Sequence, residues 1–221
     1  RYDGDAGSRF GLGHSAGGFL IAEMIRLGLT GGIGMGKSTA AGFLLKNGAK
    51  VSDSDALARE FVEPGQPALM EIVDAFGDGV LRKDGSLDRA KMSALVFNDS
   101  TAREKLEGIL HPRIREAWQA RLDGWAAAGE QLAVAVIPLL FETQGETNFD
   151  RTVCVACSPE VQRERLKSRG WSDGEIERRV AAQMGVDEKM KRSDHVVWTD
   201  GPIEAQAAQW DVLLSSWDGL A

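Results

Sequence analysis

The residues with the clearest chemistry form a glycine-rich segment near the start of the chain, Gly31-Gly-Ile-Gly-Met-Gly-Lys-Ser38. The segment fits the pattern G-x-x-x-x-G-K-[ST] in full, and it stands between an apolar run and a stretch with helical spacing. Glycines let consecutive N–H groups curl around a phosphate, and a helix that begins at Lys37 points its positive end at the same anion. The Lys37 ammonium would neutralise the β- and γ-phosphates, and the Ser38 hydroxyl would ligate Mg²⁺. We therefore expect a site for a magnesium-bound nucleotide; the alternative is a turn that only joins a strand to a helix.

Two carboxylates, Asp53 and Asp55, follow a second short strand. Because alternate residues of a strand face the same side, we expect both to point into one cleft. A small-molecule kinase needs a carboxylate within hydrogen-bond reach of the acceptor hydroxyl, which it orients and deprotonates. The alternative is that one aspartate caps the helix that begins near Ala56. The two roles are compatible, since there are two residues.

A basic segment covers residues 163–192, with nine Lys/Arg against six Asp/Glu in a chain whose formal net charge is −7. A basic island on an acidic protein suggests one local anionic ligand rather than a general polyanion. In a kinase, such a segment would be a lid whose arginines clamp the transferred phosphoryl group and exclude water. The alternative is a solvated helix face with i,i+4 ion pairs, and we expect about half of these charges to be only that.

Strands and helices alternate along the chain. Apolar or β-branched runs predict strands over 25–30, 49–53, 132–137, 151–156 and 195–198. Helical spacing predicts helices over 37–47, 54–63, 66–76, 159–169 and 202–217, and shorter helical pieces over 171–192. Residues 88–128 are expected to be largely helical, with a break at His111-Pro112, because proline disfavours helical geometry in its predecessor. This order predicts an α/β fold whose parallel sheet carries its ligands at the carboxyl ends of the strands.

Composition excludes several classes of protein. The 221 residues are 43% hydrophobic and 27% charged, which is ordinary for a globular chain, and the acidic balance argues against a nucleic-acid or membrane-surface binder. The longest apolar run, Leu132–Phe141, has ten residues, about half of what a membrane span needs. Two cysteines exclude a disulfide scaffold and suit the cytoplasm; we expect Cys154 and Cys157 to be core residues. The glycine-rich segment Arg1–Glu23 is interpreted as an extension without regular structure.

Several of these pieces together resemble the dephospho-coenzyme A kinase family. The glycine-rich loop, Asp53-Ser-Asp55, His111-Pro112 and Pro138-Leu-Leu-Phe-Glu142 occur in the family's order, and the resemblance runs from about Met24 to Trp217. The loop alone is shared by many families, whereas this ordered set is much more specific.

The resemblance implies ATP-dependent transfer of a phosphoryl group to the ribose 3′-hydroxyl of dephospho-coenzyme A, with ATP and Mg²⁺ and with neither nucleic acid nor membrane as partner. It implies a three-layer P-loop kinase core with a five-stranded parallel sheet, formed by 24–60, 129–162 and 193–221. A helical acceptor-binding region over 61–128 and a lid over 163–192 would complete a cytoplasmic protein that is a monomer or weak homo-oligomer.

The resemblance also implies roles for individual residues. The catalytic residues would be Asp55, as base or orienter of the hydroxyl, with Lys37 and Arg165 at the phosphates. The ATP-binding residues would be Gly32, Ile33, Gly34, Met35, Gly36, Lys37, Ser38, Thr39, Arg165 and Arg169, with Ser38 on the metal. The acceptor side would hold Thr30, Asp55, His111 and Glu142.

Two other functions stay open on the sequence. One is another small-molecule P-loop kinase, acting on nucleosides or their monophosphates. The other is a nucleotide-dependent binding protein without catalysis. A GTPase is disfavoured, because the chain lacks the guanine-reading pattern [NT]-K-x-D.

Overall fold

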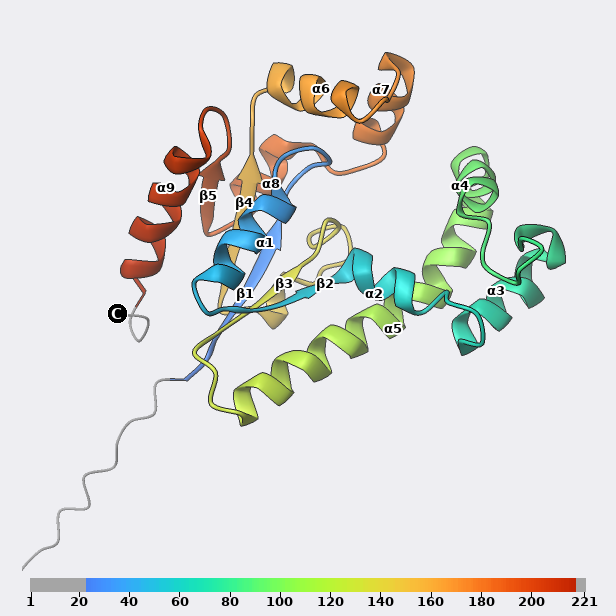
Figure 1. Cartoon of the computed structure of the whole chain (residues 1–221), viewed down its shortest axis with the longest axis horizontal. Helices are drawn as coiled ribbons and strands as arrows, with labels where there is room; N and C mark the ends of the chain where they lie inside the picture. The colour runs from blue at the N-terminus through green and yellow to red at the C-terminus, as the bar shows by residue number, and fades with distance from the viewer. Residues whose placement is uncertain (1–22, 218–221) are drawn as a thin grey trace, which may run out of the picture.

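The centre of the molecule is a five-stranded sheet in which all strands are parallel, in the order β2-β3-β1-β4-β5 (Figure 1). The computed structural model describes residues 23–217, so the extension expected before Met24 lies, apart from Glu23, outside the described residues. The strands are β1 (Ile25–Thr30), β2 (Lys50–Asp53), β3 (Leu132–Val136), β4 (Arg151–Ala156) and β5 (His195–Trp198). The predicted parallel α/β fold and its five strands are thus confirmed, with bounds that differ by one residue at most.

One face of the sheet is covered by α1 (Lys37–Lys46) and α9 (Ile203–Ser215). The strands alternate as a two-faced sheet requires, since Val134 and Val136 of β3 pack on this side. Burial is complete at the centre, where Leu44 of α1 and Trp210 of α9 have no exposed surface. This packing fixes α1, and with it the loop that precedes α1, against the middle of the sheet.

The opposite face packs against α2 (Ser54–Glu60) and the second half of α5 (Ser100–Ala127). The residues of β3 that point this way are Ala133 and Ala135, and their small side chains leave room for Trp118 and Leu122 of α5. A three-layer arrangement results, as the sequence predicts.

A helical arm extends from this layer, at the right of Figure 1. It contains α3 (Pro67–Phe76), the short η1 turn (Asp78–Val80), α4 (Arg89–Asn98) and the first half of α5. The arm has a core of its own, formed by Val62, Leu69, Ile72, Val80, Leu87 and Met92. Helix α5 therefore belongs to both units, because its first half closes the arm and its second half packs on the sheet.

The break expected at His111-Pro112 is wrong, because α5 runs through Pro112 without interruption. An internal proline costs roughly 3 kcal/mol, but the helix is held by the arm on one side of it and by Trp118 and Leu122 on the other. One carbonyl of the affected turn, that of Ile109, also accepts a hydrogen bond from the Arg113 side chain at 2.5 Å.

The actual interruption in this helical region is at Asp99, between α4 and α5. Asp99 has extended geometry, and its side chain accepts from the backbone N–H groups of Thr101 and Ala102 at 2.8 and 3.2 Å. A helix-capping aspartate therefore starts the long helix.

The basic segment lies above the carboxyl edge of the sheet and is helical in pieces, as expected (Figure 1). Its helices are α6 (Pro159–Ser168), α7 (Asp173–Ala181) and α8 (Val186–Arg192). Within residues 23–217, no helix has both the length and the apolar character that crossing a membrane requires.

Candidate active site

The phosphate loop follows β1, the middle strand of the sheet, and leads directly into α1. Gly31 has a φ of +145°, and a Cβ at this position would lie 2.3 Å from the carbonyl oxygen of Val155 in β4. Gly34 has a φ of +76°, and its Cβ would lie 2.9 Å from the Leu166 side chain. Only glycine fits both positions, so the loop's shape is imposed by the neighbouring strand and by α6.

Lys37 points back over this loop. Its ammonium donates to the carbonyl oxygens of Gly31 and Gly32 at 2.8 and 3.0 Å. The pKa of Lys37 is lowered to about 8, mainly by burial. Asp55 opposes this shift, and the positive charge of Lys189 adds to it. The lysine is therefore held where a bound phosphate would lie, in surroundings that favour an anionic partner.

The two aspartates divide their roles between capping and the site. Asp53 ends β2, and its carboxylate accepts from the backbone N–H groups of Asp55 and Ala56 at 2.8 and 3.4 Å. Asp55 already belongs to the first turn of α2. The expectation that strand alternation aims both carboxylates into one cleft is therefore wrong, since the strand ends at Asp53 and helical geometry sets the direction of Asp55.

Asp55 nevertheless lies close to the phosphate loop. Partial burial raises the pKa of its carboxyl, Asp53 raises it further, and Lys37 and Arg59 lower it. The parallel strands β1 and β2 both end at this edge of the sheet, before Lys37 and Asp55 respectively, and the two charges act on each other's pKa. The Asp55 residue is still exposed to solvent, so an acceptor can reach it.

A pocket of about 230 Å³ opens on the outer side of the loop. It brings together five residues predicted to bind ATP, namely Gly34, Gly36, Thr39, Arg165 and Arg169. No sequence pattern indicated its other lining residues, which follow β5 or lie on α9, namely Thr199, Gly201, Ile203 and Gln206. The amide nitrogen of Gln206 is buried there without a hydrogen-bond partner among the described residues, so it offers a donor to a ligand.

Arg165 is fixed in this pocket by the residue that follows β5. Its guanidinium donates to the hydroxyl of Thr199 at 2.9 Å and to the Thr199 carbonyl at 2.5 Å. The Thr199 hydroxyl in turn donates to the carbonyl oxygen of Met35 in the phosphate loop at 3.0 Å. Thr199 therefore joins α6 to the loop.

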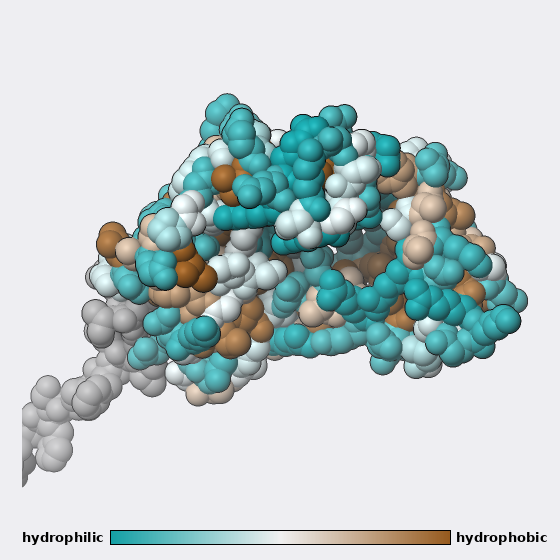
Figure 2. All heavy atoms as spheres, turned by 45° about the horizontal axis from the view of Figure 1, so that its top comes forward, coloured by the Kyte–Doolittle hydropathy of each residue, from teal (hydrophilic) through white to brown (hydrophobic). Residues whose placement is uncertain are grey.

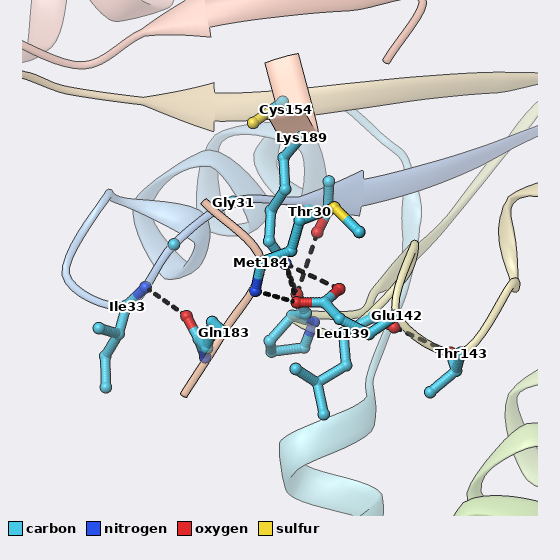
Figure 3. A network of polar contacts seen from close by, with 12 residues as sticks. Thr30, Gly31, Ile33, Leu139, Glu142, Thr143, Cys154, Gln183, Met184 and Lys189 are labelled. Carbon is cyan, nitrogen blue, oxygen red and sulfur yellow. Dashed lines mark hydrogen bonds and ion pairs between the residues drawn. The ribbon is translucent and has the colours of Figure 1, made fainter. Parts of the chain in front are cut away.

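On the acceptor side, a polar network centres on the carbonyl oxygen of Pro138, just after β3 (Figure 3). This oxygen accepts from the Thr30 hydroxyl at 3.3 Å and from the ammonium of Lys189 at 2.5 Å. Lys189 is fully buried and also bonds both carboxylate oxygens of Glu142, at 2.8 and 3.0 Å. The backbone N–H of Met184 donates to the same carboxylate at 2.9 Å. The network brings Thr30 and Glu142 together through Lys189, a residue for which the sequence reasoning had no role.

Several charges of the basic segment are paired within it. Arg163 contacts Asp173 and Glu177, Lys167 contacts Asp173, and Arg179 contacts Glu175. These pairs are solvent-exposed, as the alternative of a solvated helix face predicts for part of the segment's charge.

Another arginine of this segment bridges to the helical arm. The guanidinium of Arg178, on α7, lies 5.5 Å from the ring centroid of Phe97 on α4. Figure 2 shows a hollow in the surface between these two parts of the molecule.

Among the residues that the structure describes, His111 and the two cysteines take no part in the ion pairs of this cluster. His111 is half-buried on α5, and within residues 23–217 no hydrogen bond or ion pair joins it to Asp55. Cys154 and Cys157 are buried free thiols, as expected, and burial raises the pKa of Cys154 to about 11.

The fold and the site together define a P-loop kinase. The phosphate loop follows the central strand of a parallel sheet, Asp55 follows the edge strand β2 at the same carboxyl edge, and helix α6 contacts the loop. The Dephospho-CoA kinase family profile matches residues 25–205. The chain belongs to this family.

Relatives agree over nearly the whole chain. The chain is 49% identical to the dephospho-CoA kinase of Anaeromyxobacter dehalogenans over 194 residues, which cover 87% of this chain and 92% of that protein. It is 41% identical to the dephospho-CoA kinase of Bacillus cereus, over 87% of this chain and 96% of the relative.

Solved structures give the same picture. TT1252 from Thermus thermophilus superposes with a TM-score of 0.76 at 34% identity, over 89% of this chain and all of that one. The dephospho-CoA kinase from Campylobacter jejuni, at 21% identity, shares the fold with a TM-score of 0.60, over 88% of this chain and 97% of that one.

Proposed function

We propose that the protein transfers the γ-phosphoryl group of ATP to the ribose 3′-hydroxyl of dephospho-coenzyme A, giving coenzyme A and ADP, in the last step of coenzyme A synthesis. The observation that carries the proposal is that Lys37 and Asp55 follow two parallel strands, β1 and β2, at the same carboxyl edge of the sheet, close enough that each charge acts on the other's pKa. A loop for phosphates and a carboxylate for an alcohol are the two parts that such a transfer needs. Membership of the family agrees with this substrate pair.

In this mechanism the protein contributes mainly position and charge. The N–H groups of the loop from Gly32 to Thr39 surround the phosphates, and Lys37 leaves the carbonyls of Gly31 and Gly32 to contact them. Asp55 accepts the hydrogen bond of the 3′-hydroxyl and takes its proton as the oxygen bonds the γ-phosphorus. The bond from that phosphorus to the β–γ bridging oxygen breaks, and ADP leaves. Arg165 and Arg169, from α6 and its end, line the pocket on the outer side of the loop, and we assign them to the nucleotide.

Ser38 would hold Mg²⁺ through its hydroxyl. It is exposed in the first turn of α1, next to Lys37. Within the described part of the chain, no group of three His, Cys, Asp or Glu side chains is placed to hold a metal. A single protein hydroxyl fits Mg²⁺, which usually keeps water and takes its other ligands from substrate phosphates. When bound, the ion would neutralise phosphate charge.

For the acceptor, we assign Thr30, His111 and Glu142 to its side of the site and the helical region over 61–128 to its binding. Thr30 and Glu142 support this, since Thr30 bonds the Pro138 carbonyl and Glu142 is joined to the same carbonyl through Lys189. Residues 163–192 would act as the lid, and the bridge between Arg178 and Phe97 shows a point where it meets the arm. The free thiols agree with the cytoplasm as its place of action. We expect a monomer or a weak homo-oligomer, since one chain supplies all these groups.

The affinity for ATP should fall as the pH rises above about 8. The pKa of Lys37 in the free protein is about 8, so the loop loses its positive charge above that pH. Bound phosphates raise this pKa again, so ATP binding takes up a proton in this range. Calorimetric titrations from pH 7 to 9.5, in buffers of different ionisation enthalpy, measure both effects. Lys37→Met should bind weakly and without this pH dependence, and a flat wild-type profile would contradict the placement of Lys37.

A coupled ADP-release assay with a panel of hydroxyl acceptors tests the function. We expect dephospho-coenzyme A to stimulate ADP release strongly, and nucleosides, nucleoside monophosphates and a no-acceptor control to give little. Stimulation by a nucleoside or its monophosphate alone would favour the other kinase class. Equal release with and without every acceptor would favour a nucleotide-hydrolysing or binding protein.

A further inference from the structure

One residue of the phosphate loop, Ile33, has both its backbone N–H and its backbone carbonyl held by side chains from elsewhere. The backbone N–H of Ile33 donates to the side-chain oxygen of Gln183 at 3.1 Å (Figure 3), and its carbonyl accepts from the side-chain nitrogen of Gln162 at 2.7 Å. The two contacts also fix how each amide is turned, since an N–H needs an oxygen opposite it and a carbonyl needs a nitrogen.

The two glutamines come from opposite ends of the lid helices. Gln162 lies on α6 and is 8% exposed, and Gln183 follows the end of α7. The chain between them carries most of α6 and all of α7. Both ends of this segment therefore meet at the same residue, Ile33.

Inside the loop, support comes from the Lys37 ammonium on the carbonyl oxygens of Gly31 and Gly32 and from one backbone bond. That backbone bond, between Met35 N and Gly32 O, is long, at 3.3 Å, and Gly34, which follows Ile33, adopts a positive φ. Without the two glutamines, the peptide groups on either side of Ile33 would rotate more easily. Their rotation would turn the following N–H groups away from the direction in which they must point to surround a phosphate.

We infer that Gln162 and Gln183 are positioning residues that fix the backbone on both sides of Ile33 and thereby couple the place of the α6–α7 part of the lid to the shape of the phosphate loop. The inference rests on the proposed function, because it concerns the site at which ATP binds. Neither glutamine needs to touch the reacting atoms. A loop held in its binding shape binds ATP more tightly. A loop that moves on binding shifts both ends of the segment between Gln162 and Gln183.

Two substitutions test this coupling, Gln162→Met and Gln183→Met, which keep side-chain length and remove the hydrogen bond. Each should weaken ATP binding by about two- to tenfold, the usual effect of one hydrogen bond. The double variant should lose less than the product of the two, because both act on the backbone of the same residue, Ile33. Calorimetry measures ATP binding directly, without turnover.

The matched control is Gln209→Met. Gln209 on α9 makes the same pair of contacts to a backbone, accepting from Trp198 N and donating to Trp198 O, both at 2.8 Å. It holds the edge strand rather than the phosphate loop, so its loss should leave ATP affinity unchanged. Melting temperatures of all variants show whether any loss of binding is only a loss of fold.

A second pair separates hydrogen-bond direction from charge. Gln183→Glu keeps an acceptor for the Ile33 N–H, whereas Gln162→Glu places an acceptor against the Ile33 carbonyl. Both add one negative charge close to the phosphate loop, so the effect of charge is shared by the two variants. Because only Gln162→Glu also loses its hydrogen bond to Ile33, it should bind ATP more weakly than Gln183→Glu.

The position of the lid has its own reporter in Trp171, the tryptophan between α6 and α7. In protein labelled with 5-fluorotryptophan, ATP should shift the fluorine resonance of Trp171, assigned with Trp171→Phe, and the double methionine variant at saturating ATP should lose much of that shift. Unchanged ATP affinity in Gln162→Met and Gln183→Met, or an equal loss in Gln209→Met, would overturn the inference. Failure of the proposed function would instead appear in the wild type, as ADP release that dephospho-coenzyme A does not stimulate.

Discussion

Asp55→Asn should lower kcat for phosphoryl transfer by about 10²- to 10⁴-fold, the contribution of a positioned proton acceptor. ATP affinity should stay close to that of the wild type, because the phosphate loop and Lys37 are unchanged. Asparagine has the same shape as aspartate and suits the first turn of α2, so the fold should persist. Steady-state kinetics with both substrates, together with calorimetric ATP binding, measure the two effects separately.

The same carboxylate should give the wild-type enzyme an acid limb in its pH–rate profile. Asp55 must be ionised to accept the proton, and its pKa is raised by burial and by Asp53. The rate should therefore fall as the pH drops through a value above the usual carboxyl range, and the residual rate of Asp55→Asn should lack this limb.

Asp53→Asn is the matched control. Asparagine caps helices as well as aspartate does, so the start of α2 should be preserved. Loss of the charge of Asp53 removes one cause of the raised pKa of Asp55, so the acid limb should move to lower pH. A near-normal kcat in Asp55→Asn, or an equal loss in Asp53→Asn, would contradict the role given to Asp55.

Glu142→Leu should be the most destabilising of these substitutions, lowering the free energy of unfolding by about 3–5 kcal/mol. The reason is its partner. Lys189 is fully buried, so without the carboxylate its ammonium keeps only the Pro138 carbonyl and cannot reach water. Urea unfolding followed by tryptophan fluorescence measures the change.

Lys189→Met should cost less, because Glu142 has 23% of its side chain exposed and can turn to water. The double variant should recover part of the stability lost in Glu142→Leu, since a paired charge is replaced by apolar groups on both sides. A Lys189→Met variant less stable than Glu142→Leu, or strictly additive effects in the double variant, would show that the ion pair does not control stability here.

Features encoded by neighbouring residues could be predicted from the sequence. The five strands are short apolar runs between turn signals, and the phosphate loop is one contiguous pattern, so both follow from local chemistry. The loop's place at the carboxyl end of the central strand follows from the alternation of strands and helices.

Features that depend on distant contacts could not be predicted. Lys189 and Glu142 are 47 residues apart, and Gln162 and Ile33 are 129 apart, so no local pattern indicates either pair. The helix through Pro112 shows packing on two cores overriding a local preference. The expectation that Asp53 and Asp55 share one face of a strand is wrong, because the strand ends at the capping Asp53.

The most direct measurement is the distance from the Asp55 carboxylate to the acceptor oxygen, in a crystal structure with a non-hydrolysable ATP analogue and dephospho-coenzyme A. We expect the ribose 3′-oxygen within about 2.6–3.2 Å of Asp55 and in line with the γ-phosphorus, with the triphosphate enclosed by residues 31–38. An Asp55 that faces away from the ribose, or a triphosphate bound outside the loop, would contradict the account.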